Sequence, residues 1–519
     1  MSRTKNAIKN AGFGILGKIL TMGFTFASRT VFIIVLGNTY LGVNGLYSEV
    51  LAVLSFAELG FGNALTFAMY YPVAHDEHEK IIKLLDFYKI VYRIIAGLIA
   101  LLGIIIVPFL PYIIKGADWL SIRELRVYFI IFLFNTVVSY FVTYKFSYTN
   151  ALQKNYITTN FNTILSLVSS GAQIIVLLLT KSFFAYLLVN SGILLISRIF
   201  ISTYLNNKFP IFKERPQEKL SKSEKKHIYK EVRGLIFHQF GSIAVHSTDN
   251  IIISAFTGMG VVAVGLISNY SLITSSVLGF VTILFSSVIS GFGNLAATSS
   301  NRQFHKVFEY INFANFWIYG FCSVAFFVLI PPFIDLWIGT ENRIDSISFA
   351  LIIINLYLQG QSTTYNNARI AKGNFGKDKW LSLLQAIVNL VISIVGAYYL
   401  GLIGVYIGTV VSRLVFVITR PLSTYRFLFG ESCVVYYKKL VIYFSAVCLA
   451  AISTYFLVDV LLLSNVTVIR FVISVAIVAV LPNIIFLALF FKTKEFKFWK
   501  ERGTIVLIKL KKLLCRGSK

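Results

Sequence analysis

Residues 28–46 read SRTVFIIVLGNTYLGVNGL, and residues 248–266 read TDNIIISAFTGMGVVAVGL, with few identities but closely matched hydropathy. The two stretches align without a gap at an offset of 220 residues. The tetrapeptide GFGN also occurs twice, at Gly60–Asn63 and Gly291–Asn294, and further matches follow in the same order at offsets between 215 and 231. This order indicates an internal duplication. Duplication is a recurring way to build a carrier, with its substrate site where the copies meet.

The composition is that of a membrane protein with many spans. Hydrophobic residues make up 57% of 519 positions, 13% are charged, and the mean hydropathy is +0.76. These values exclude an ordinary soluble domain. Apolar runs of about 20 residues predict an all-α integral membrane protein with about fourteen transmembrane helices, arranged as two pseudo-symmetric six-helix lobes plus two C-terminal helices. The predicted helices are 11–36, 45–70, 91–114, 127–147, 157–180, 183–206, 233–256, 261–290, 312–337, 346–368, 380–400, 402–422, 436–459 and 466–491.

The positive charge follows the predicted topology. The chain has 48 Lys and Arg against 22 Asp and Glu, a formal net charge of +26. With both termini in the cytoplasm, 37 of the cations lie in inside segments or at the inner ends of the predicted helices. The outside loops then hold five, which are Lys115, Arg123, Arg126, Lys181 and Arg343. This bias predicts cytoplasmic N- and C-termini, and it makes anionic membrane lipids, not nucleic acid, the partners of the basic segments.

The predicted domains follow the duplication. An uncleaved first helix opens the N-lobe, a Pro-containing cytoplasmic segment joins the lobes, and a basic amphipathic tail is expected on the inner leaflet. The boundaries are 1–206 for the N-lobe, 207–232 for the linker, 233–426 for the C-lobe, 427–491 for two accessory helices and 492–519 for the tail.

Ionisable residues inside predicted spans mark candidate functional positions, because a charge at the bilayer centre costs about 2.5–3.5 kcal/mol on insertion scales. Lys18 and Arg29 share one face of the first helix, with Met22 and Thr25 between them at spacings of 4, 3 and 4. The 220-residue offset maps Lys18 onto His238 and Arg29 onto Asp249. We expect these side chains to face one another across the lobes.

Arg198 and Arg413 stand at equivalent places in the sixth and twelfth predicted helices and complete a cationic cavity. Guanidinium donors match phosphate oxygens in a forked geometry, so the cavity is expected to attract an anionic headgroup. The predicted substrate-binding residues are Arg29, Lys18, Arg198, Arg413, Asp249 and His238. The alternative is that Arg29 and Asp249 form a fixed interhelical ion pair, while Lys18 and Arg413 extend to the inner interface.

Glu49, Glu58 and Asp249 are candidates for ion coupling, since Glu49 and Glu58 share one face of the second predicted helix. The alternative is that each carboxylate is satisfied by a neighbouring Lys or Arg. The four cysteines are scattered, and His238 and His246 fit a polar contact better than a metal site. No metal, cofactor or catalytic residue is predicted.

Four further segments carry a family resemblance: KNAGFGILGKIL at 9–20, GVNGLYSEVLAVLSFAELGFGNAL at 42–65, and the pair YTNALQKN at 148–155 and YNNARIAKGN at 365–374. With the duplicated twelve-helix core, they resemble the multidrug/oligosaccharidyl-lipid/polysaccharide exporter superfamily. Within it, they are most similar to the Wzx-like polysaccharide flippases of bacteria. The resemblance covers about residues 5–490.

The resemblance implies a two-lobed carrier that alternates between inward-open and outward-open states. It would move an undecaprenyl-diphosphate-linked oligosaccharide across the bacterial cytoplasmic membrane for capsule or surface polysaccharide, beside a polysaccharide polymerase machinery. No covalent chemistry is implied, so the chain is not expected to be an enzyme. Arg29 stands where cationic family cavities place a basic residue, whereas Asp249 departs from that pattern.

Other functions remain open on the sequence. A cation-coupled multidrug exporter of the same superfamily would favour an acidic, aromatic cavity, and a peptidoglycan lipid II flippase is the nearest relative in function. A membrane glycosyltransferase or polymerase is less favoured, because such enzymes commonly need a sizeable outside loop. The longest outside stretches here, 115–126 and 335–346, have about a dozen residues.

Overall fold

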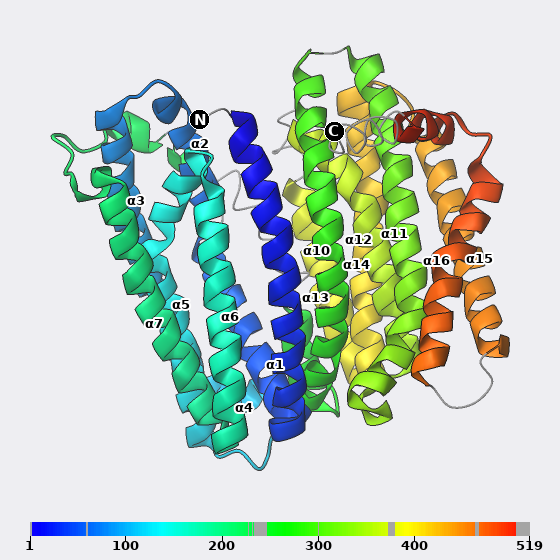
Figure 1. Cartoon of the computed structure of the whole chain (residues 1–519), viewed down its shortest axis with the longest axis horizontal. Helices are drawn as coiled ribbons and strands as arrows, with labels where there is room; N and C mark the ends of the chain where they lie inside the picture. The colour runs from blue at the N-terminus through cyan, green and yellow to red at the C-terminus, as the bar shows by residue number, and fades with distance from the viewer. Residues whose placement is uncertain are drawn as a thin grey trace, which may run out of the picture. The chain divides into compact units, whose positions relative to one another are not determined.

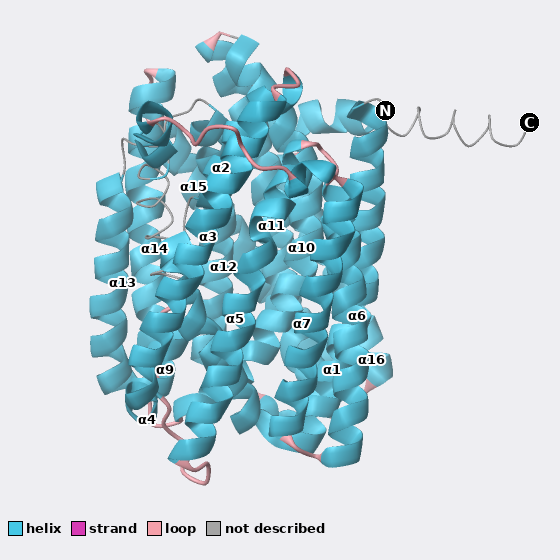
Figure 2. Cartoon of the chain, turned by 90° about the vertical axis from the view of Figure 1, so that its left-hand side faces the viewer, coloured by secondary structure: helices cyan, strands magenta, loops and turns pink. Residues whose placement is uncertain are grey.

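The structure, a computed structural model, describes residues 3–58, 61–226, 228–230, 232, 247–298, 300–371, 379–461 and 467–504. These residues are almost entirely helical, and the described part of the chain contains no strand (Figure 2). The all-α prediction is therefore confirmed. The chain forms two compact units: the first comprises residues 1–283 and 382–409, and the second comprises 284–381 and 410–519.

The first unit contains the helices of the N-terminal half (Figure 1). They are α1 (Arg3–Leu54), η1 (Ser55–Glu58), α2 (Phe61–Ala74), α3 (His78–Ile106), η2 (Val107–Phe109), α4 (Leu110–Ile113), α5 (Ile122–Ala151), α6 (Asn155–Thr180), α7 (Phe183–Lys208), η3 (Pro210–Lys213) and α9 (Asp249–Phe256). It also includes the first part of α10 (Gly260–Thr298), most of α13 (Lys379–Leu400) and the start of α14 (Leu402–Thr424).

The second unit is built from the remaining helices. They are α11 (Asn301–Ile338), η4 (Thr340–Asn342), α12 (Ser346–Ala371), η5 (Tyr425–Phe429), α15 (Val434–Leu461) and α16 (Val468–Phe490), together with the other parts of α10, α13 and α14. Both α15 and α16 pack on α11. Phe316 of α11 stacks on Tyr443 of α15 with ring centroids 4.2 Å apart, and lies 5.2 Å from Phe486 of α16. The two C-terminal helices are thus integral parts of this core.

Local sequence signals explain where several helices begin and bend. Ser121 and Glu124 form a capping box at the start of α5, and Ser182 and Ser300 cap α7 and α11. The backbone of α1 breaks at Gly37, where φ is 78°, a conformation that glycine adopts without steric cost. The break separates the two helices that the sequence predicts at 11–36 and 45–70.

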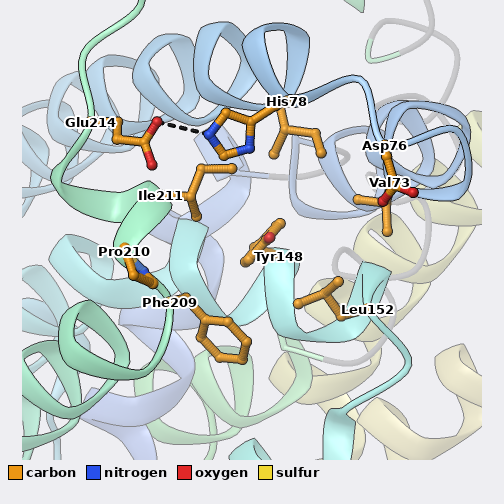
Figure 3. Close-up of a pocket in the computed structure, with 10 residues that line it drawn as sticks. Val73, Asp76, His78, Tyr148, Leu152, Phe209, Pro210, Ile211 and Glu214 are labelled. Carbon is orange, nitrogen blue, oxygen red and sulfur yellow. Dashed lines mark hydrogen bonds and ion pairs between the residues drawn. The ribbon is translucent and has the colours of Figure 1, made fainter. Parts of the chain in front are cut away.

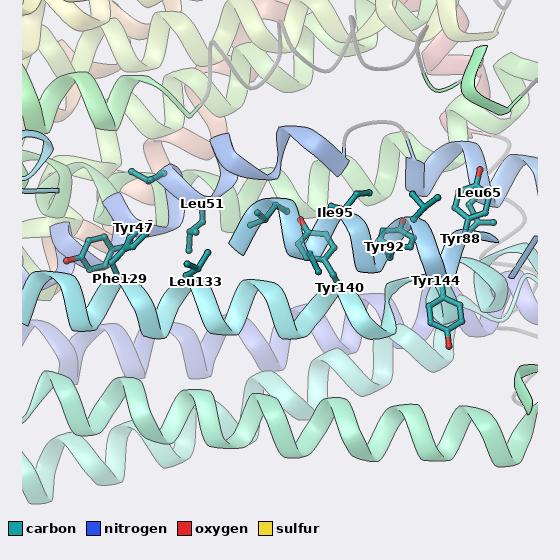
Figure 4. Close-up of a cluster of buried hydrophobic side chains, with 14 of the residues drawn as sticks. Tyr47, Leu51, Leu65, Tyr88, Tyr92, Ile95, Phe129, Leu133, Tyr140 and Tyr144 are labelled. Atoms are coloured by element: carbon teal, nitrogen blue, oxygen red, sulfur yellow. The ribbon is translucent and has the colours of Figure 1, made fainter. Parts of the chain in front are cut away.

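Aromatic side chains fill the core of the first unit, where α1 packs along α6 and α3 packs along α5. Figure 4 shows Tyr47 of α1 beside Phe129 of α5, and their ring centroids lie 5.4 Å apart. The Tyr47 hydroxyl donates to the Leu125 carbonyl at 2.7 Å. Buried tyrosines of this kind combine a large apolar surface with a satisfied polar end.

Eleven helices in the described residues are long and apolar enough to cross a membrane. The other three predicted spans have specific explanations. The second is interrupted after Leu54 and continues as the shorter α2, the seventh lies mostly outside the described residues, and the tenth corresponds to α12, which is more polar. Large apolar side chains such as Ile94, Leu179 and Ile196 are exposed on the helices, as lipid-facing residues are.

The linker after α7 is docked on the first unit. The backbone N–H of Gln217 donates to Glu79 at 3.0 Å, and Glu214 pairs with His78 at 2.8 Å. Figure 3 shows the hydrogen bond between His78 and Glu214 beside a cavity of about 350 Å³, with Tyr148 and Ile211 pointing into it. The described part of the linker therefore belongs to this unit, while the predicted boundary between linker and C-lobe stays a prediction.

The tail begins as a helix fixed to the second unit. The Trp499 indole donates to the Tyr310 carbonyl at 2.8 Å, and Lys439 of α15 pairs with Glu495 at 2.8 Å. Lys439 also pairs with Glu309 of α11. Residues 494–504 are thus held by specific contacts, and the rest of the predicted amphipathic tail lies outside the described residues.

Candidate functional site

Helices α1 and α10 meet inside the first unit, where their backbones approach closely at two glycines. A Cβ atom on Gly265 would lie 3.1 Å from the Gly42 nitrogen and 3.0 Å from the Asn38 carbonyl carbon, and one on Gly42 would overlap the Val261 carbonyl. Only glycine permits backbones to approach so closely. We call these four residues, Asn38, Gly42, Val261 and Gly265, the glycine seam.

Arg29 lies on α1 next to the glycine seam and is half-buried. Its Nη1 donates to Ser268 Oγ at 2.7 Å and to Asn269 Oδ1 at 3.4 Å. Ser268 in turn donates to the Gly265 carbonyl at 2.7 Å, so a chain of hydrogen bonds joins the guanidinium to the seam. Both partners of Arg29 are neutral, and its charge is not paired with any carboxylate among the described residues.

Lys18 lies three turns before Arg29 and also faces α10. Its aliphatic stem covers Gly279, where an added Cβ would lie 2.9 Å from the lysine Nζ. The structure thus brings Lys18 and Arg29 to the same side of α1, against one partner helix. This arrangement places two cations along a single interhelical contact.

Asp249, the predicted counterpart of Arg29, has a different partner. It opens α9, and its Oδ2 accepts a hydrogen bond from Thr409 Oγ1 of α14 at 2.7 Å. Asn389 of α13 donates to the same Thr409 hydroxyl at 3.3 Å. Within the described residues, Arg29 and Asp249 do not form the ion pair that the sequence left open.

Two of the remaining predicted cavity residues have described contacts of their own. Arg198 of α7 lies over the Phe146 ring of α5, at 5.9 Å from its centroid. Arg413 belongs to the second unit, is 7% exposed, and donates from Nε to Asn355 of α12 at 3.1 Å. His238 lies outside the described residues. The single cluster of cations predicted from the sequence stays a prediction.

The two candidate coupling glutamates have polar neighbours. Glu49 of α1 accepts from Asn250 of α9 at 3.5 Å and lies beside Ser247. Glu58 at the end of η1 lies beside the Tyr140 hydroxyl of α5. Neither forms an ion pair with a Lys or Arg of the described chain. Each carboxylate is therefore held by neutral donors, as Asp249 is by Thr409.

Sequence reasoning did not identify Ser268 or Thr409, the closest partners of the two central charges. Serine and threonine are common in membrane helices, where the hydroxyl usually bonds to the carbonyl three or four residues earlier. Ser268 does this with Gly265 while also accepting from Arg29. Composition alone carries no signal that separates such a residue from its many equivalents.

Comparison with known proteins identifies the fold. No protein-family profile matches the chain, and no curated protein matches it. Solved structures do match it: the lipid II flippase MurJ in an inward closed conformation superposes with a TM-score of 0.64 at 13% identity, covering 94% of this chain and 99% of that chain.

Two MATE transporters, one of them a multidrug resistance transporter, share the fold as well. An inward-facing MATE family transporter of the MOP superfamily superposes with a TM-score of 0.59 at 16% identity, over 80% of this chain and 98% of its own. The MATE transporter VcmN of Vibrio cholerae, solved as a mutant, superposes with a TM-score of 0.55 at 14% identity, covering 83% of this chain and 98% of its own. The chain therefore has the fold of MOP-superfamily transporters. At these identities the likeness extends to the fold alone.

Proposed function

We propose that this protein is a flippase that moves an undecaprenyl-diphosphate-linked oligosaccharide across the bacterial cytoplasmic membrane by alternating access, for capsule or surface polysaccharide. The observation that carries the proposal is Arg29. Within the described residues, its half-buried guanidinium is held only by neutral acceptors, so it presents uncompensated positive charge where we propose that the repeats meet. Such a site favours a phosphate-bearing substrate over a cationic drug.

The glycine seam supplies a place for the conformational change. Backbone contact at Gly42 and Gly265 closes the repeats against each other on one side of Arg29, and separation of α1 from α10 would expose Arg29 from that side. Because Arg29 bonds to Ser268 on α10, a phosphate that competes for the guanidinium would weaken the same contact. Substrate binding and gate opening are thus linked through one side chain.

The driving force follows from charge. Each negative charge that moves outward under an inside-negative potential gains about 2.3 kcal/mol per 100 mV. The carboxylates Asp249, Glu49 and Glu58 are the candidates for coupling to an ion gradient, since neutral donors hold all three.

A lipid II flippase is the second candidate, and a specific observation favours it over a drug exporter. The likeness to MurJ, named as a lipid II flippase, spans 94% of this chain, whereas the MATE transporters span 80% and 83%. Both flippase functions involve a lipid-linked substrate, so they differ in the sugar and not in the proposed charge recognition.

Complementation tests the proposal. The intact protein and Arg29→Ala are expressed at matched membrane abundance in bacteria that lack the flippase for a surface polysaccharide, and in bacteria depleted of their lipid II flippase. Arg126→Ala, at an exposed arginine, is the control. We expect surface polymer to be restored by the intact protein and the control but not by Arg29→Ala. Rescue of the strain depleted of its lipid II flippase alone would assign the second function. Failure to rescue either kind of strain, tested in hosts that make several different sugar repeat units, would reject both flippase functions.

A further inference from the structure

A second cation-rich site lies in the first unit, away from Arg29. It is a cavity of about 280 Å³ bounded by α3, α5, α7 and η3, and it contains Lys89, Arg93 and Lys145. We call it the basic pocket. The first half of α3 and the last turns of α5 and α7 form its walls, and the predicted topology places all of these on the cytoplasmic side. None of its residues belongs to the predicted transport cavity.

Lys145 gives the pocket a fixed positive charge. Its side chain is 3% exposed, and Nζ donates to Ser202 Oγ and Asn206 Oδ1 at 2.7 Å each and to the Ser202 carbonyl at 3.2 Å. These three acceptors use all three donors of the ammonium group, and all are neutral. The hydrogen bonds hold the charge in place without cancelling it.

Two more cations stand beside Lys145. Lys89 lies close enough for its charge to act on Lys145, and Arg93 is one turn further along α3. Asp86 precedes Lys89 by three residues but forms no ion pair with it, and the described chain places no carboxylate in an ion pair with any of the three cations. Like charges gathered in a partly enclosed cavity repel one another unless an anion joins them.

The surroundings of the basic pocket are apolar and exposed. Ile90 and Ile94 on α3 are 45% and 64% exposed, and Phe141 on α5 is 51% exposed. Such side chains on a membrane helix contact lipid acyl chains, whereas a free phosphate ion would make no favourable contact with them. Basic pockets between membrane helices on the cytoplasmic side are known to bind anionic lipid headgroups.

We propose that the basic pocket binds the phosphate group of an anionic phospholipid of the inner leaflet, as a site separate from the transport route. The phosphate contacts Lys89 and Arg93, with the fixed charge of Lys145 behind them. The acyl chains lie along Ile90, Ile94 and Phe141. Arg93 presents the forked donors that suit phosphate oxygens, and Lys89 adds a mobile point charge.

Native mass spectrometry of the full-length protein in detergent tests this site. The probes are phosphatidylglycerol and phosphatidylcholine with identical acyl chains, each also tested against added inorganic phosphate. The variant is Lys89→Gln with Arg93→Gln, and the matched control is Lys222→Gln with Lys226→Gln, two exposed cations of the linker. We expect phosphatidylglycerol to bind more tightly than phosphatidylcholine, and to lose affinity by roughly 30-fold in the variant but not in the control.

Three results would overturn the proposal. Equal binding of the two lipids would show that no headgroup is recognised, and equal loss in both double variants would show only a general effect of charge. Displacement of phosphatidylglycerol by millimolar inorganic phosphate would assign the pocket to a free anion. Lys145→Met is expected to weaken phosphatidylglycerol binding, although Lys145 does not contact the lipid. This result counts only if the unfolding temperature of the variant in lipid-free detergent matches that of the unchanged protein. Complementation by Arg29→Ala does not depend on this site, so the two proposals fail separately.

Discussion

Gly42 of α1 and Gly265 of α10 approach so closely that a Cβ atom on Gly265 would stand 3.1 Å from the Gly42 nitrogen. A methyl group on Gly42 would overlap the Val261 carbonyl, which belongs to the helix backbone and cannot rotate away. Gly42→Ala should therefore separate α1 from α10. Overpacking costs about 1–3 kcal/mol, enough to shift a conformational equilibrium about tenfold.

The seam prediction has a matched control in Gly45, where an added Cβ would meet Val264 at an ordinary 3.6 Å. A reporter cysteine at Thr30 is introduced after replacement of the four native cysteines, and a membrane-impermeant maleimide is added from outside. Labelling of Thr30→Cys should rise about tenfold with Gly42→Ala and stay unchanged with Gly45→Ala. Equal labelling of both variants would show that the glycine seam is not a gate.

Asp249 is expected to couple transport to an ion gradient. Asp249→Asn removes the charge but keeps an oxygen that accepts from Thr409, so packing should survive. In reconstituted vesicles, the variant should transport at a rate that no longer responds to an imposed proton or sodium gradient. Thr409→Val is the comparison, because it loses the hydrogen bonds of the Thr409 hydroxyl to Asp249 and Asn389, each about 1 kcal/mol, and keeps the carboxylate. A gradient response that persists in Asp249→Asn would remove this residue from the coupling mechanism.

The sequence predicted the helices well because membrane spans are set by length and hydropathy, which are local properties. It also ended the first predicted helix at residue 36, beside the break that the structure places at Gly37. The partners of the charges were not predictable. Arg29 and Asp249 occupy matching positions at the 220-residue offset, yet Arg29 bonds to Ser268 of α10 and Asp249 bonds to Thr409 of α14. Which hydroxyl meets which charge depends on helix rotation, and hydropathy does not encode rotation.

Lys439 joins three elements of the second unit, and its removal should loosen the tail. Lys439→Met would leave Glu309 and Glu495 without their shared cation, at a cost of about 1–3 kcal/mol for these partly buried groups. We expect a lower unfolding temperature in detergent and faster tryptic cleavage after Lys497. Lys438→Met, one residue earlier and exposed, should change neither. Equal protease resistance in the two variants would mean that the Lys439 ion pairs are not needed to hold the tail.

The linker carries a capping box that should make its helix sensitive to acid. Hydrogen bonds from the Ser221 hydroxyl and backbone N–H, at 2.8 and 2.9 Å, lower the pKa of Glu224. The lowered pKa of Glu224 stabilises the folded linker at pH values above the unfolded-state pKa of about 4.3. This stabilisation is lost as the pH falls through the lower pKa of the folded linker. Amide exchange at residues 222–226, corrected for its intrinsic pH dependence, should speed up in that window.

Two substitutions separate the parts of this effect. Ser221→Ala should raise exchange at all pH values, because losing an N-cap hydroxyl costs about 1 kcal/mol. Glu224→Gln should abolish the acid dependence and leave exchange constant between neutral pH and pH 3, since the amide does not titrate there. An acid response that survives Glu224→Gln would place the titrating group elsewhere.

The membrane orientation decides which leaflet the basic pocket faces. Of the 48 Lys and Arg, 37 lie on the predicted inside, and this bias predicts that Lys222 is cytoplasmic and Lys181 external. In the cysteine-free background, an impermeant maleimide added to intact cells should label Lys181→Cys, whereas Lys222→Cys should be labelled only after permeabilisation. Both positions are exposed, so access to the side chain is equal. The reverse labelling pattern would mean that the membrane orientation is opposite to the predicted one. The glycine seam would then face the cytoplasm, and the basic pocket would lie in the outer leaflet, where an inner-leaflet lipid could not reach it.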